Sequence, residues 1–160
     1  RRNNLTSKEH SNSSLARAQG SNRVEEISSV IPNSPTLAMV RKIVIEFVDH
    51  KDQRYDTCGD WLLEPSGTLR IKVSKTEDPR CAIAVAYHEL TEALLCTQRG
   101  ISGQAVDDFD MDQGAEYDEP GRHPSAPYHR EHLFATAVER RFIETLGVPW
   151  NDHTKAIDNL

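Results

Sequence analysis

The sequence predicts an α+β domain in which a strand and a β-hairpin are followed by two packed helices. Residues 42–48 are rich in β-branched and aromatic side chains, and residues 69–73 alternate apolar with charged ones, as half-exposed strands do. Residues 81–97 contain no Lys, Arg, Asp, Asn or Gln, and a helix that is apolar nearly all round is a buried one. Apolar residues at helical spacing between residues 127 and 146 predict the second helix.

The expected strands lie close together in the chain. One face of the strand at residues 42–48 is apolar and is made by Ile43, Ile45 and Phe47. A second strand is expected at residues 61–64, and the turn residues at 65–68, Pro-Ser-Gly-Thr, connect it to the strand at 69–73. A turn this short between two strands predicts an antiparallel hairpin.

The buried helix has start and stop signals in the sequence. Asp78 is a suitable N-cap, Pro79 suits the first helical position, and Gly100 suits the C-cap. We expect four apolar residues on one side of this helix to anchor it in the core: Ile83, Ala86, Leu90 and Leu94.

The amino-acid composition and net charge indicate the domain organisation and exclude some classes of partner. Residues 1–36 are rich in Ser and Asn with few apolar residues, so we expect a disordered N-terminal tail before a single domain at residues 37–160. The net charge of −6 and the lack of a basic stripe argue against a nucleic-acid partner or an anionic membrane surface. No apolar run approaches the roughly 20 residues that cross a bilayer, and we expect a cytoplasmic protein.

The connection between the two helices, residues 100–127, is long and is acidic from residue 107 to 119. Loops of this length are usually functional or disordered, so we expect an acidic lid or a solvated loop. Four of its acids match the spacing of a calcium-binding EF-hand loop, but the glycine falls one place late and prolines prevent the outgoing helix. Those four acids are Asp108, Asp110, Asp112 and Glu119.

The central helix carries the chemistry. His88 and Glu92 are four residues apart and can therefore aim an imidazole nitrogen and a carboxylate oxygen at one point, with Glu89 on the adjacent edge. Buried carboxylates need a compensating charge, and a divalent cation supplies it directly. The alternative is an ion pair with an arginine of the last helix: Arg130, Arg140 or Arg141.

A zinc site of the catalytic kind typically has three protein ligands, so a further ligand must come from elsewhere. His132, near the start of the last helix, is the first choice, and Glu131 is a close rival or a fourth ligand. Glu139, two turns beyond His132, is a suitable carboxylate to orient the imidazole of His132.

The order of strand, hairpin and buried helix with His88-Glu89-Leu90-Thr91-Glu92 resembles the minimal core of the zincin metallopeptidases. The chain is most similar to short zincin-like proteins of phages and prophages, over roughly residues 42–152 and in phrases at residues 119–121, 126–128, 131–132 and 146–150. The resemblance implies that His88 is the first metal ligand and that Glu89 is the general base. The usual second ligand of the family is histidine, HExxH, where this chain has Glu92; a carboxylate there suits Fe or Mn as well as Zn.

Two functions follow as hypotheses. The first is a zinc-dependent metallopeptidase, a zincin-type hydrolase of peptide bonds, whose hairpin edge binds an extended peptide or protein substrate. The second is a non-enzymatic phage or prophage accessory protein in which a structural metal joins the two helices. If the chain is phage-encoded, either would work in the host cytoplasm. An open coordination position would favour the first, and four protein ligands the second.

Overall fold

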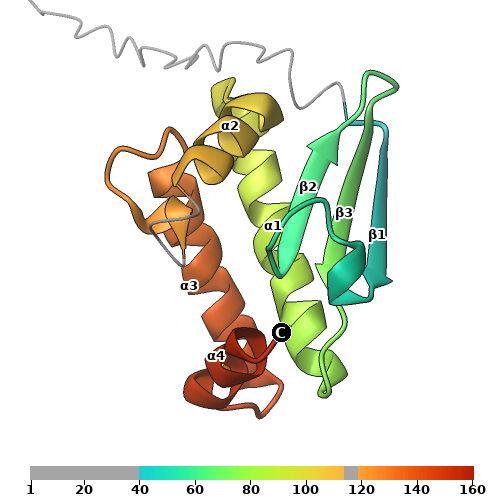
Figure 1. Ribbon diagram of the computed structural model, residues 1–160, viewed down its shortest axis with the longest axis vertical. Coiled ribbons are helices and arrows are strands. Elements are labelled where there is room, and N and C mark those ends of the chain that lie inside the picture. Colours follow the sequence, from blue (N-terminus) through green and yellow to red (C-terminus); the bar gives the residue numbers. More distant parts are fainter. Residues whose placement is uncertain (1–39, 114–118) are drawn as a thin grey trace, which may run out of the picture. The chain divides into compact units, whose positions relative to one another are not determined.

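The computed structural model describes residues 40–113 and 119–160, so the expected disordered tail at residues 1–36 lies outside the described residues. Within the described ranges the fold is of the α+β class, as predicted (Figure 1). The elements are β1 (Lys42–Val48), η2 (His50–Asp52), β2 (Gly59–Leu63), β3 (Thr68–Ser74), α1 (Pro79–Arg99), α2 (Gly103–Gln113), η3 (Pro120–Arg122), α3 (His129–Thr145) and α4 (Trp150–Asp158).

The strands form a sheet in the order β1-β3-β2. β2 and β3 are antiparallel, which confirms the predicted hairpin, and Gly67 in their turn has a φ of 83° that favours glycine. β1 pairs with β3 in parallel, which the local sequence pattern does not specify. The central strand contributes Leu69, Ile71 and Val73 to the core, where all three are buried.

α1 matches the predicted buried helix. The Asp78 side chain accepts a hydrogen bond from the Arg80 backbone N–H, and Gly100 ends the helix in the left-handed conformation at φ 75°. Small residues of α1 bring the helix close to β2 and β3. Of the residues expected to anchor α1 in the core, Ala86 is buried, as predicted. The prediction is wrong for Ile83, which is 40% exposed. Ile83 shares its side of α1 with Tyr87, one turn later, which is 45% exposed. Leu90 and Leu94 are partly buried and pack against the core.

The connection after α1 differs from the expected loop. Residues 103–113 form α2, which places Asp108, Asp110 and Asp112 of the EF-hand count on a helix instead of a calcium-binding loop. Arg54 holds this helix against the sheet, because its guanidinium donates to Asp60 of β2 at 2.6 and 2.7 Å and to Asp107 of α2 at 3.0 Å. Residues 103–113 of the expected lid or solvated loop are thus a packed helix.

α3 lies against α1, and the short helix α4 follows it. The contact of α1 with α3 includes Cys81 and Ala84 packed against Ile143, and Tyr87 stacked on Phe142 at 4.1 Å between ring centroids. The predicted second helix is therefore confirmed, while α4 is an addition that the sequence analysis missed. Among the described helices, none is long and apolar enough to span a membrane.

Candidate metal centre

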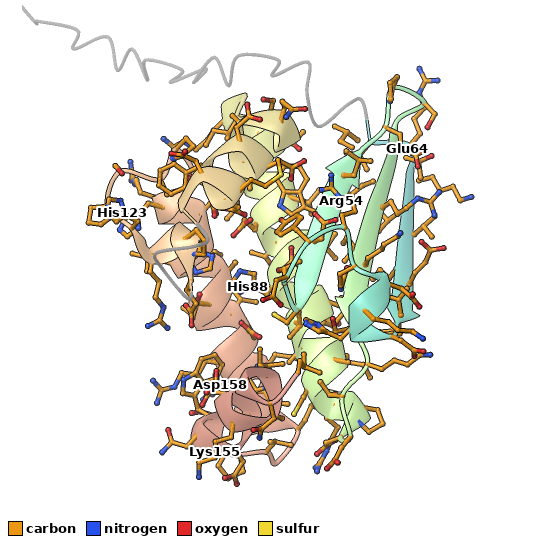
Figure 2. All side chains as sticks on the ribbon, in the orientation of Figure 1. Arg54, Glu64, His88, His123, Lys155 and Asp158 are labelled. Carbon is orange, nitrogen blue, oxygen red and sulfur yellow. The ribbon has the colours of Figure 1, made fainter. Side chains whose placement is uncertain are left out.

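Three side chains from two helices converge between α1 and α3. His88 and Glu92 of α1 and His132 of α3 have potential ligand atoms that all lie within 4.8 Å of one another. Figure 2 shows the labelled His88 directed from α1 toward α3. The two residues that the sequence pairs on one helix and its first choice for a third ligand are thus brought together.

Glu92 lies at the centre of this group. Its Oε2 is 3.0 Å from Nδ1 of His132 and 3.4 Å from Nε2 of His88. Its Oε1 accepts a hydrogen bond of 3.1 Å from the indole N–H of Trp61 on β2. One carboxylate therefore connects both helices and the sheet.

The pKa values of this group reflect its internal pairing. Burial alone would raise the pKa of Glu92, but hydrogen bonds from His132 and His88 outweigh it and lower the pKa to about 2. Burial would lower the pKa of His88, yet its contacts with Glu139 and Glu92 raise that pKa well above the ordinary value. In the metal-free chain, protons on the imidazoles thus balance the buried carboxylates.

The donor set fits a divalent metal ion. Two imidazoles and a carboxylate are the ligand types of catalytic zinc sites, and Fe or Mn also accepts them. Nε2 of His132 is buried and, within the described ranges, has no hydrogen-bond partner. A buried ring nitrogen without a partner costs free energy unless something binds it, and a metal ion would do so.

Glu139 and His153 form a second layer behind His88. Glu139 of α3 contacts Nδ1 of His88 at 2.9 Å through Oε2, and Nε2 of His153 at 2.8 Å through Oε1. Glu139 therefore orients His88 and not His132, which corrects the sequence-based prediction. The pairing leaves Nε2 of His88 directed at Glu92, as a metal ligand with a carboxylate partner requires. His153 of α4 was not foreseen, because no local pattern marks it.

Glu131 does not join the group, which corrects its role as a rival ligand. It forms an ion pair with Arg99 at the end of α1, and its Oε2 is buried without a hydrogen-bond partner among the described residues. Glu131 points about 100° away from His132 around the axis of α3, and there its carboxylate meets Arg99 instead of the group. The alternative ion pair with an arginine of the last helix is likewise not found, since no described ion pair links Arg130, Arg140 or Arg141 to α1.

Glu89 lies beside the group on the side of β2. It is 8% exposed and has no hydrogen-bond partner in the described part of the chain, while a Cβ added to Gly59 would lie 2.5 Å from its Oε1. Burial raises the pKa of Glu89 well above the ordinary value, and the nearby charges of Glu92 and Asp60 add to this effect. An unpartnered carboxyl group with a raised pKa is suited to accept and release a proton.

One cavity of about 970 Å³ is lined by the three candidate ligands and by Glu89, Glu139 and His153. Its wall also includes β2, α2, η3 and α4. Asp110 of α2 is part of this wall and accepts a hydrogen bond from the hydroxyl of Tyr128. The group is thus accessible from a space large enough for part of a substrate.

Comparison of the chain with models of known protein families, with curated proteins and with solved structures finds no match.

Proposed function

We propose that the chain is a metal-dependent hydrolase of the zincin type that acts on peptide bonds. The observation that carries the proposal is the convergence of His88, Glu92 and His132 at a cavity that also contains the unpartnered Glu89. A divalent ion, Zn or alternatively Fe or Mn, would supply Lewis-acid polarisation of a carbonyl group and activation of water.

In this proposal the residues of the cavity have three roles: metal binding, orientation of a ligand and proton transfer. His88, Glu92 and His132 hold the ion, and Glu139 keeps the ring of His88 in the orientation that frees Nε2. Glu89 takes a proton from the attacking water and returns it to the leaving amine. Its position on the next residue after His88 directs its carboxyl toward Gly59 of β2, on the substrate side of the cavity.

β2 is an edge strand, and its position at the cavity is consistent with a substrate that is a peptide. Ser74 N–H donates to the Cys58 carbonyl and Glu64 N–H to the Thr68 carbonyl, so in this antiparallel pair residues 60 and 62 also face β3. The backbone groups of Gly59, Trp61 and Leu63 therefore point away from β3, and the first two residues line the cavity. The Gly59 carbonyl accepts a hydrogen bond from the Thr57 hydroxyl at 2.7 Å, so a substrate strand would displace this contact. An extended peptide that paired with this edge would lie next to Glu89.

The resemblance to zincin-like proteins of phages and prophages agrees with this proposal. It would place the chain in the cytoplasm of a host cell, with a peptide or protein as substrate. The carboxylate at position 92 distinguishes the site from the histidine of the family pattern.

One observation favours the second candidate, an accessory protein with a structural metal. Oε2 of Glu119 lies 3.7 Å from Nε2 of His132, close enough for both atoms to bind one ion. Four protein ligands would close the site and leave no position for substrate. Glu119 is also paired with Arg122 and its side chain is 51% exposed, which favours its displacement from an ion.

The experiment combines metal analysis of protein purified without chelator with hydrolysis of a peptide library. Glu89→Gln preserves size but cannot accept a proton, so it should keep the metal and the fold and lose about a hundredfold or more of the rate. Glu119→Gln is the matched test of the second candidate, because it lowers metal affinity only if Glu119 is a ligand. A parent chain that binds metal but hydrolyses no peptide would refute the first function, and hydrolysis that survives Glu89→Gln would refute the role of Glu89.

A further inference from the structure

The outer edge of β1 has unpaired backbone groups. Lys42 N–H donates to the Gly67 carbonyl at 3.3 Å, and Lys75 N–H donates to the Val48 carbonyl at 2.8 Å. In a parallel pair of strands, every second residue of one strand forms its backbone hydrogen bonds with the other strand. These two bonds therefore show that residues 42, 44, 46 and 48 are the ones that bond to β3. The groups of residues 43, 45 and 47 therefore point away from the sheet, and nothing in the described ranges pairs with them.

The same three residues carry exposed apolar side chains. Ile43, Ile45 and Phe47 are 46%, 41% and 42% exposed. The register places them beside the core residues of β3, on the face of the sheet that α1 covers. α1 packs mainly on β3 and β2, so it leaves these side chains of β1 more than 40% exposed, and Figure 1 shows β1 at the outer edge of the sheet.

A flat apolar edge of this kind attracts another strand, and proteins usually protect it with charges, prolines or a covering segment. The face that carries Ile43, Ile45 and Phe47 has no charge and no proline within β1, because the two charged residues of the strand, Lys42 and Glu46, lie on the other face. The edge thus has both requirements for strand addition, free backbone groups and an apolar surface.

We propose that β1 pairs in antiparallel fashion with β1 of a second copy of the chain, about a two-fold axis at Ile45. In this register Ile45 lies opposite Ile45 of the second copy, and Ile43 lies opposite Phe47. Each of these residues has its backbone N–H and C=O at the free edge, so every opposed pair exchanges two hydrogen bonds. A two-fold axis closes the assembly as a dimer.

The other face of the strand is compatible with the same register. Lys42 lies diagonally across from Glu46 of the second copy, and Val44 lies directly opposite it. No two like charges of β1 are opposed. If the register shifted by one residue, each outward-facing residue of one strand would lie opposite a residue of the other strand whose backbone groups already bond to β3. The two strands could then not exchange hydrogen bonds.

The proposal is independent of the metal centre, because β1 and β2 are at opposite edges of the sheet. Sedimentation of the full chain between about 1 and 300 μM, a range that brackets a micromolar Kd, should show a monomer–dimer equilibrium. Ile45→Lys places two ammonium groups opposite each other at the axis and should raise the Kd about tenfold or more. Leu62→Lys is the control, since Leu62 is 40% exposed on β2.

Cysteine pairs test the register. Under mild oxidation a mixture of the Ile43→Cys and Phe47→Cys chains should form a covalent heterodimer, because opposed residues lie about 5.5 Å apart in Cα positions. Either variant alone should not, since its two copies of the new cysteine would be four residues out of register. The parent is the control for disulfides of Cys58, Cys81 and Cys96.

Three outcomes would overturn the proposal. A chain that sediments as a monomer throughout the range would assign the β1 face to another segment or partner. A dimer that Ile45→Lys leaves unchanged must use another surface. Cross-linking of either single variant to the same extent as the mixture would exclude this register.

Discussion

Replacing Glu139 with Gln tests whether the layer behind His88 determines the metal affinity of the site. The carboxylate now contacts ring nitrogens of both His88, at 2.9 Å, and His153, at 2.8 Å. A carboxylate accepts at both oxygens, whereas a Gln amide accepts at its oxygen and donates at its nitrogen. The substitution changes no side-chain size and is confined to a buried position.

Both orientations of the new amide are unfavourable. If its NH₂ group faces Nδ1 of His88, the ring proton must move to Nε2, the nitrogen directed at Glu92, which then cannot bind a metal. If the NH₂ group faces Nε2 of His153, the proton of that ring moves to Nδ1, which is buried without a described hydrogen-bond partner. The first orientation costs metal affinity and the second leaves an unpaired buried donor, worth about 1–3 kcal/mol.

We therefore expect Glu139→Gln to lower metal affinity about 10- to 100-fold, the usual effect of removing a carboxylate behind a ligand. Competition with a chromogenic chelator measures the affinity, and circular dichroism verifies the fold. Glu144→Gln is the matched control, because Glu144 is on the same helix but pairs with Arg140 at the surface. A metal affinity within about threefold of the parent would refute the orienting role of Glu139.

Three further predictions address the neighbours of the ligands. Gly121→Ala should weaken metal binding, because the new Cβ would lie 2.5 Å from Cγ and 2.6 Å from Nδ1 of His132; an unchanged affinity would mean that this ring is not a ligand. Glu131→Gln should leave the metal affinity unchanged, because the partner of Glu131 is Arg99, and should lower the melting temperature because that ion pair is lost. A variant that no longer binds metal would show that Glu131 is a ligand after all. In the metal-free chain, the lowered pKa values of Glu92 and Glu139, about 2 against 4.5, contribute stability above pH 4.5 that is lost as the pH falls toward 2. Denaturant unfolding at a series of pH values checks this, and a constant free energy of unfolding below about pH 5 would contradict it.

The parts of the fold that the sequence predicted are those with local causes. α1 has its N-cap, its proline and its C-cap within the helix and its flanks, and the hairpin has its turn between adjacent strands. The pairing of His88 with Glu92 follows from the helical period alone. His132 was preferred to His129 because it borders the apolar face of the last helix, next to Ala135.

The parts that the sequence did not predict depend on distant residues. No turn specifies the parallel pairing of β1 and β3. α2 is held by Arg54, which precedes β2 in the chain and is 53 residues away from its partner Asp107. The spacing on the last helix suggested that Glu139 orients His132, whereas the packing of α3 against α1 and α4 brings Glu139 to His88 and His153. Glu131 was a rival ligand because an unpaired carboxylate on the apolar face of the last helix needed an explanation, and Arg99 at the end of α1 supplies it.

The carboxylate at position 92 is the point at which this site departs from the HExxH pattern, and its contacts explain why the site is built around it. Trp61 donates to one oxygen, and both imidazoles contact the other. A histidine has only one acceptor nitrogen when neutral and could not serve the indole N–H and an ion together. In the metal-free chain the protons of His88 and His132 balance Glu92 and Glu139, and one divalent ion would replace two protons without changing the buried net charge. With histidine at position 92 the charges of such a site would differ by one, so Glu92 and Glu139 together would make the site neutral if a divalent ion is bound.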